Sequence, residues 1–272
     1  MKGQNIFTSM VLALSAAVAM SNSAEAGTFT TNFSPNPVTD PTADIELLSI
    51  VRNDGKTIVD FQLVNSVNII KNFADLGPAS TDNGDNATPP PGLTPKEKPL
   101  ASEIAAYLGN NNLNNIIDSE DGGAFELDVF FESAVASSNT KIDSFFFWER
   151  GMNSDLKVQA INASGYLLGN AFTIDKLFWQ FAGFEIKTTE ITKAQNVGAW
   201  GVSFADLGLT SGSLVSGLKL ISETGFHGPD FKLVAHTSFC CTPIPEPTTM
   251  IGLGAVAGLM LVRRRQMKTK TI

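Results

Sequence analysis

The residues best suited to chemistry lie in the densest acidic stretch, DSEDGGAFELDVFFE, which runs from Asp118 to Glu132. Against the calcium-loop pattern D-x-[DN]-x-[DN]-G, Asp118, Glu120 and Gly123 fall at the first, third and sixth positions, but Gly122 and Val129 occupy the fifth and twelfth. That departure rules out a regular EF-hand. It leaves open an irregular calcium site, of the kind found in extracellular β-domains, with ligands drawn from Asp118, Glu120, Asp121 and Asp128.

A polar turn that enters a strand explains the same stretch without a metal, since Phe125, Leu127 and Val129 alternate with polar residues. A second oxygen-rich segment, DNGDN, spans Asp82 to Asn86. No further acidic residue follows it at loop spacing, so a solvated turn is favoured there over calcium ligation.

The chain is poorly supplied with catalytic groups. It has only two histidines, lacks G-x-S-x-G, and carries its two cysteines side by side at Cys240 and Cys241. A nucleophilic triad and a zinc or copper site are therefore not expected. Glu149 and Asp155 are a conceivable glycosidase pair, but carboxylate pairs arise by chance in so acidic a chain. We expect no catalytic residues and no enzymatic activity.

Aromatic side chains suggest a different kind of site, because flat rings stack on the faces of sugars. On a sandwich they would form a carbohydrate-binding face made of Trp148, Tyr166, Trp179 and Trp200. Core packing is the favoured alternative, since Phe145, Phe147 and Phe178 surround two of the tryptophans. WERGMNSD, from Trp148 to Asp155, is the most distinctive internal stretch and reads either as a binding loop or as a packed hairpin.

The elements that must position these residues are mostly strands. Residues 44–52 and 57–65 flank NDGK, whose Asp54-Gly55 pair predicts a hairpin. Residues 76–99 contain six prolines and predict a loop or linker, and one helix is expected from Leu100 to Leu108.

The second half of the chain reads as strands separated by turns rich in Gly, Asn and Asp. The expected strands are 141–149, 156–161, 166–174, 184–191, 199–204, 214–221 and 231–236. Their number and spacing predict a mainly β protein, an antiparallel β-sandwich with a jelly-roll-like connection.

The N-terminus has the features of a secretory signal. Lys2 precedes an apolar run from Ile6 to Met20, and Ala24 and Ala26 form an A-x-A cleavage site. We expect residues 1–26 to be a signal helix that is removed, leaving Gly27 first in the mature chain. An uncleaved anchor is the less favoured alternative.

The C-terminal segment, residues 242–272, combines three features in a fixed order. Pro245, Glu246 and Pro247 come first, an apolar stretch from Thr248 to Val262 follows, and then come Arg263, Arg264 and Arg265. We expect this stretch to be a short single transmembrane helix. Fifteen helical residues span about 22 Å, less than the roughly 30 Å of a bilayer core, so the helix would be either a marginal anchor or a temporary one. The arginines would hold its end in the cytoplasm and the body outside.

This order resembles the PEP-CTERM sorting signal of exported bacterial proteins, which an exosortase of the inner membrane processes. The resemblance implies cleavage near the PEP residues and release of the body, residues 27–241, to the cell surface or the extracellular matrix. It implies nothing about what the body binds. The body has the general look of exosortase-dependent surface proteins and resembles no enzyme family.

Charge narrows the range of partners. The whole chain has 19 basic and 27 acidic residues. Without Lys2, Glu25 and the five basic residues beyond the apolar segment, 13 basic and 26 acidic residues remain between Gly27 and Pro247. Such an acidic surface argues against nucleic acid and is compatible with divalent cations. The sequence therefore predicts a non-catalytic surface or matrix protein associated with exopolysaccharide. The alternatives are a carbohydrate-binding module, with or without calcium, and, less favoured, a secreted glycan hydrolase.

Overall fold

A computed structural model describes residues 27–73 and 79–238 of the chain. Among these residues the fold is mainly β, with antiparallel sheets and one helix, as the sequence predicts. The elements are β1 Thr30–Ser34, β2 Glu46–Val51, β3 Thr57–Ile58, β4 Val64–Asn72, β5 Ser80–Asn83, α1 Ala101–Leu108, β6 Asn115–Asp118, β7 Phe125–Val135, β8 Asp143–Arg150, β9 Leu156–Ile161, β10 Leu167–Ile174, β11 Gln180–Ile186, β12 Gln195–Ser203, β13 Val215–Ser222 and β14 Phe231–Ala235.

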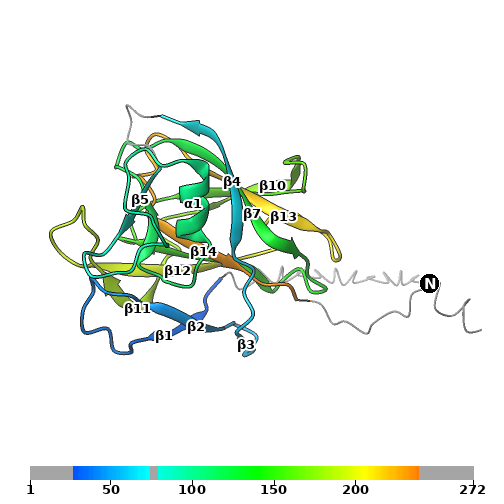
Figure 1. Cartoon of the computed structure of the whole chain (residues 1–272). Coiled ribbons are helices and arrows are strands. Elements are labelled where there is room, and N and C mark those ends of the chain that lie inside the picture. Colours follow the sequence, from blue (N-terminus) through cyan, green and yellow to red (C-terminus); the bar gives the residue numbers. More distant parts are fainter. Residues whose placement is uncertain (1–26, 74–78, 239–272) are drawn as a thin grey trace, which may run out of the picture.

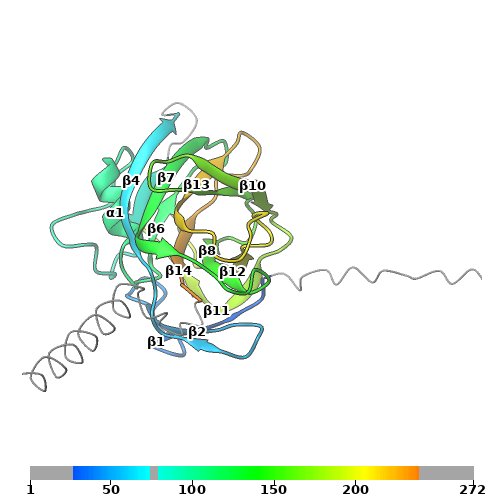
Figure 2. The same cartoon turned by 90° about the vertical axis from the view of Figure 1, so that its right-hand side faces the viewer.

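The strands form three sheets stacked in layers (Figures 1 and 2). The first has the order β10-β9-β13-β7-β4, the second β11-β12-β8-β14-β6-β5, and the third β1-β2-β3. The first two sheets enclose the main core, where Phe131 stacks on Phe145 across the layers. The result is a sandwich with an additional small sheet on one side.

The small third sheet covers the outer face of the six-stranded sheet. Phe33, Leu47 and Ile50 contribute to a second core together with Phe146 and Trp148 of β8. Strand β8 is consequently buried at all eight positions. This explains its run of four consecutive aromatic residues, Phe145 to Trp148, since a strand covered on both faces does not alternate between apolar and polar residues there.

The predicted hairpin is confirmed, with Ile50 paired to Ile58, but its second strand is only two residues long. The chain leaves the small sheet early because Gln62 pairs with Ala235 at the end of β14. Strand β4 then begins in the five-stranded sheet. The single strand expected over residues 57–65 is therefore divided between β3 of the small sheet and the start of β4 of the five-stranded sheet.

Helix α1 matches the predicted residues 100–108 and packs against β4, β5 and β6. Its N-terminus is closed by Glu103, whose Oε2 accepts the backbone N–H of Leu100 at 2.8 Å. Tyr107 lies on the buried side and donates its hydroxyl to Oδ1 of Asn83 at 3.0 Å. The helix thus closes the β5–β6 edge of the second sheet.

Several predicted boundaries are wrong, and two of them bear on the residues of the site described below. The loop expected over residues 76–99 contains β5, whose four residues are all buried. The strand expected over 184–191 is instead Gln180–Ile186, and residues 187–191 belong to the loop that leads to β12. The sequence does not predict β5 because its four residues are polar. They are held in the interior by hydrogen bonds and so lack the apolar pattern of a buried strand.

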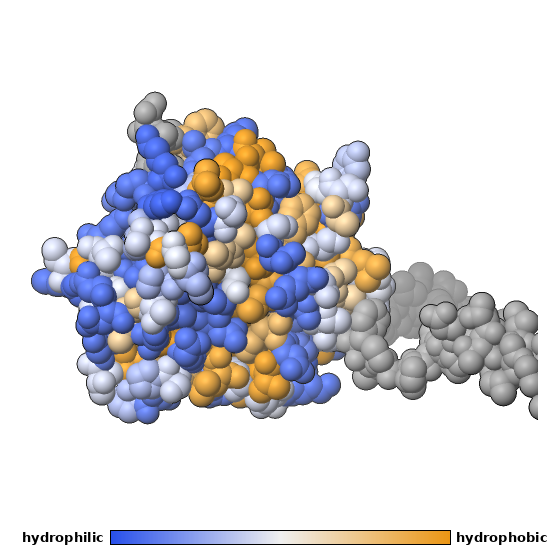
Figure 3. Space-filling model, viewed as in Figure 1, coloured by the Kyte–Doolittle hydropathy of each residue, from blue (hydrophilic) through white to orange (hydrophobic). Residues whose placement is uncertain are grey.

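The surface of the described body carries hydrophobic areas among hydrophilic ones on the face shown in Figure 3. The large exposed apolar side chains come from separate elements, for example Leu48 of β2, Ile70 of β4 and Phe181 of β11. Within residues 27–73 and 79–238, no helix has the length and apolar character needed to cross a membrane.

Candidate functional site

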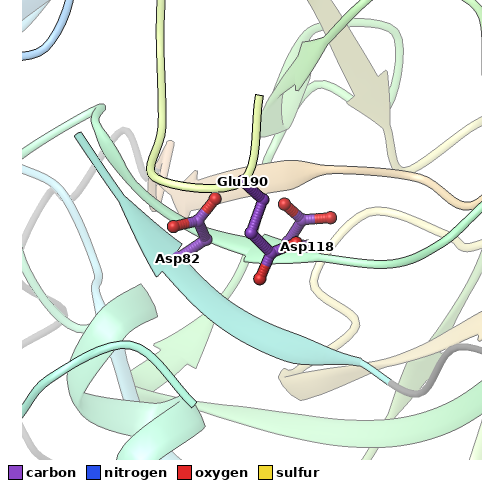
Figure 4. Close-up of side chains that lie close together, drawn as sticks. All are labelled: Asp82, Asp118 and Glu190. Carbon is purple, nitrogen blue, oxygen red and sulfur yellow. The ribbon is translucent and has the colours of Figure 1, made fainter. Parts of the chain in front are cut away.

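Three carboxylates from distant parts of the sequence converge at one end of the six-stranded sheet (Figure 4). Asp82 comes from β5, Asp118 from the end of β6, and Glu190 from the loop between β11 and β12. One oxygen atom of each lies within 4.8 Å of the others. In Figure 4 the side chain of Glu190 reaches between the other two carboxylates.

Strand pairing sets this geometry. Strands β5 and β6 are antiparallel, with Ser80 opposite Asp118 and Asp82 opposite Ile116. Asp82 is fully buried, and its Oδ1 accepts hydrogen bonds from Oγ1 of Thr189 at 2.6 Å and from the backbone N–H of Asn83 at 2.8 Å. These contacts bring the loop that carries Glu190 onto β5.

Arg150, the last residue of β8, links the aspartates. Its Nη2 lies 2.8 Å from Oδ2 of Asp118 and 2.7 Å from Oδ2 of Asp230, and its Nη1 lies 3.5 Å from Oδ2 of Asp82. The same Nη1 donates to Oγ1 of Thr188. One guanidinium therefore serves three aspartates in a buried network.

Negative charge exceeds positive charge at this cluster. Burial, and then repulsion from Asp118, raises the pKa of Asp82 and raises that of Asp230 well above its usual value. Burial with repulsion from Asp118 also raises the pKa of Glu190 to about 8. The carboxylates thus favour states in which protons or another cation offset their charge.

A polar cavity of about 210 Å³ opens beside the cluster. Of the three carboxylates, Asp118 and Glu190 line it. The other lining residues include Glu120 and Asp121 from the turn after β6, Asn153, and His227 and Gly228 from the turn before β14. Gly228 needs to be glycine, because its φ is +56° and a Cβ there would lie 2.1 Å from the backbone oxygens of Ser119 and Glu120. Close contact between these two turns forms one wall of the cavity.

The structure brings together part of the predicted calcium set. Asp118, Glu120 and Asp121 all line the cavity. Asp128 does not, because it lies on β7 in the other sheet, where its Oδ1 is 2.6 Å from Nζ of Lys219. Alternation along β7 turns Asp128 away from the core residues Leu127 and Val129.

Sequence reasoning missed Arg150, Glu190 and Asp230 as parts of one site. Arg150 lies in the distinctive stretch WERGMNSD, and Asp82 lies in DNGDN, for which the sequence favours a solvated turn. The structure corrects that preference at Asp82, which is 0% exposed, whereas Asp85 and Asn86 are exposed. Glu190 has no local signal, because its role depends on how the loop folds back onto β5.

The four aromatic residues proposed for sugar binding do not share a face. Trp148, Trp179 and Trp200 are 1%, 4% and 6% exposed, whereas Tyr166 is 72% exposed. Nε1 of Trp148 donates to Oγ1 of Thr31 and Nε1 of Trp179 to the backbone oxygen of Ser154. The tryptophan rings pack in the cores, as the favoured alternative holds.

Glu149 and Asp155 also differ in their surroundings. Glu149 is fully buried, does not line the cavity, and has a pKa raised to about 8 by burial. Asp155 is half-buried and accepts the backbone N–H of Lys176 at 2.7 Å. A carboxyl group as enclosed as Glu149 does not face a substrate.

The predicted cleavage site at Ala24 and Ala26, the two cysteines, and the sorting residues from Pro245 to Arg265 lie outside the described residues. No protein-family model matches the sequence, and neither the curated proteins nor the solved structures give a match.

Proposed function

We propose that this chain is an exported protein of the cell surface or extracellular matrix, sorted by an exosortase, with a non-catalytic structural or adhesive role in exopolysaccharide or biofilm. A signal helix would direct secretion, and a single C-terminal transmembrane helix would pause the chain in the inner membrane. Processing near Pro245-Glu246-Pro247 would then release the body, whose strands would follow a jelly-roll-like connection.

The order of the terminal segments supports this route, and the placement of the body's two ends supports it further. Gly27 accepts the backbone N–H of Gly201 at 2.8 Å, near the end of β12. At the other terminus, the backbone N–H of His236 donates to Ser144 at the start of β8, also at 2.8 Å. Ser203 of β12 pairs with Asp143 of β8, so both ends of the body leave from the same end of the six-stranded sheet.

The acidic cavity lies at the opposite end of that sheet. Arg150 ends β8, Asp230 precedes β14, and Gln195, which begins β12, lines the cavity. Seven residue steps along β8, from Asp143 to Arg150, span about 23 Å. A body held at the membrane by its C-terminal segment would therefore present this cavity away from the membrane, which suits a displayed surface protein.

Deletion of the exosortase in the producing bacterium tests the route. The body should then remain membrane-bound with its tail intact, and immunoblots of membrane and medium should show the longer form. Replacement of Glu246 by Ala should have the same effect, whereas Glu185→Ala, in an exposed position on β11, should leave processing unchanged. Release of a normally processed form from the deletion strain would refute the sorting proposal.

The role in the matrix has its own test. Cells that lack the chain should lose more polysaccharide when their biofilm is washed than cells that carry it. Equal retention of polysaccharide in the two strains would contradict the structural or adhesive role while leaving the export route in place.

A further inference from the structure

We propose that Asp82, Asp118 and Glu190 bind one calcium ion, with water from the adjoining cavity completing its coordination. The inference rests on the described residues and does not depend on the sorting route proposed above. It replaces the predicted ligand set, from which Asp128 is excluded by its position in the other sheet.

The spacing of the carboxylates fits a single ion. Calcium lies about 2.3–2.6 Å from its oxygen ligands, so two ligands on opposite sides of the ion are up to about 5 Å apart. One oxygen from each of the three residues falls within 4.8 Å of the others. The cluster therefore meets the distance requirement without a large rearrangement.

An unsatisfied oxygen provides a second, independent indication. Oδ2 of Asp82 is buried and accepts no hydrogen bond from any residue that the structure describes, although Oδ1 of the same carboxylate accepts two. Nη1 of Arg150 lies 3.5 Å from Oδ2 and is directed to Thr188. Leaving such an atom without a hydrogen bond is costly, and a cation would supply the missing interaction.

The balance of charge favours a divalent ion. Asp82, Asp118 and Asp230 share a single guanidinium, that of Arg150. Glu190, Glu120 and Asp121 add further acidic side chains at the cavity. One positive charge does not offset so many carboxylates. A divalent ion would add two positive charges and offset more of this negative charge without new protein groups.

The ligand chemistry selects calcium. All three ligands are carboxylate oxygens, which suit hard cations, and none is the histidine or cysteine that zinc and copper prefer. Magnesium requires near-ideal octahedral geometry, whereas calcium accepts irregular sites with six to eight oxygens. The bound ion would fasten the loop that carries Glu190 to the β5–β6 edge.

Calorimetric titration of the full-length chain, purified in detergent, with calcium chloride tests the proposal directly. One ion should bind with a dissociation constant in the range of about 10⁻⁴–10⁻³ M, as in other extracellular sites. At a calcium concentration of ten times that constant, the melting temperature should rise by about 3–6 °C relative to the chelated protein. No calcium binding, or an equal response to magnesium at the same concentration, would overturn the assignment.

Two exposed glutamates provide a matched pair of variants. Glu190→Gln removes one ligand charge and should weaken calcium binding at least tenfold. Glu185→Gln, on neighbouring β11 and outside the cluster, should leave the affinity unchanged. Asp82→Asn, if it folds, should abolish the rise in melting temperature caused by calcium. If it does not fold, Glu190→Gln still tests the site, because Glu190 lies in a loop. Equal affinity in the Glu190 variant and the unmodified chain would contradict the site.

Discussion

Arg150 and Asp230 face each other across the β8–β14 edge of the cavity, and the guanidinium directs both Nε and Nη2 to a single carboxylate oxygen, at 3.1 and 2.7 Å. The backbone N–H of Arg150 also donates to the backbone oxygen of Asp230, at 2.9 Å. The other carboxylate oxygen of Asp230 accepts the backbone N–H of Ser119 at 2.9 Å. The pair thus fixes the turn after β6 to the end of the central strand.

Arg150→Met should destabilise the body strongly. Methionine keeps much of the aliphatic volume but removes the charge that Asp82, Asp118 and Asp230 share, leaving several buried carboxylates uncompensated. Loss of one partner from a buried ion pair costs about 3–5 kcal/mol, and the urea midpoint should fall accordingly. Measurements in a chelator keep calcium from masking the effect.

Lys157→Met is the matched control, because Lys157 forms a partly exposed ion pair with Glu223 on the five-stranded sheet. Exposed pairs contribute about 1 kcal/mol or less. Equal losses in the two variants would contradict the view that Arg150 holds the acidic cluster together.

The buried carboxyl of Glu149 should make stability depend on pH. Its pKa is raised to about 8 by burial, against 4.5 for the unperturbed group. Below pH 4.5 the group is protonated in both states. Between 4.5 and 8 the unfolded chain loses the proton while the folded chain keeps it, so the free energy of unfolding falls as pH rises and levels off above 8.

Glu149→Gln should therefore flatten the fall in melting temperature between pH 5 and pH 8, measured in a chelator. The expected gain at pH 8, relative to pH 5, is on the order of 3 kcal/mol. The exposed Glu185→Gln should retain the slope of the unmodified chain. An unchanged slope in the Glu149 variant would show that its carboxyl is not protonated in the folded state.

Local patterns predicted much of the fold because the strands of the second half alternate with clear turns. The hairpin at Asp54-Gly55 and the helix ending at Leu108 likewise follow from neighbouring residues. The third sheet could not be predicted from local patterns. The apolar residues of β8 indicate a strand buried on both faces, but they do not identify the element that covers the second face.

The acidic site was only half predictable for a related reason. Asp118 and Asp82 lie in stretches that attract attention by composition, but they meet only because β5 and β6 pair. Glu190 joins them through a loop whose threonines contact Arg150 and Asp82. Such long-range contacts depend on strand order, which residue spacing does not encode. The sequence also groups Asp128 with Asp118 because they are only ten residues apart, but the two residues lie in different sheets.

Gly228→Ala should distort the wall of the cavity as well as lower stability. Its φ of +56° already disfavours alanine, and the added Cβ would meet the backbone oxygens of Ser119 and Glu120 at 2.1 Å. Gly55 provides the comparison, because its φ is also positive, at +77°. Apart from its chain neighbours, no heavy atom of the described residues would lie within 4 Å of a Cβ added there. Gly55→Ala should cost about 1 kcal/mol from backbone strain alone, and Gly228→Ala at least twice as much in urea unfolding. Similar costs would mean that the two turns separate without penalty.

The three layers lead to a prediction about adjacent phenylalanines on β8. Phe147 packs between the two large sheets, and Phe146 packs under the small third sheet, where it meets Phe29 edge-on with ring centroids 5.1 Å apart. In a sandwich of two layers, one of two neighbouring residues on a strand would face solvent, and its truncation would cost little. Here both Phe146→Ala and Phe147→Ala should cost about 3–5 kcal/mol by urea denaturation.

Phe181→Ala, at a position 55% exposed on the edge strand β11, should cost far less than either. If Phe146→Ala resembled Phe181→Ala instead of Phe147→Ala, the small sheet would not be packed on β8. The comparison therefore measures whether residues 30–58 are an integral layer of the body.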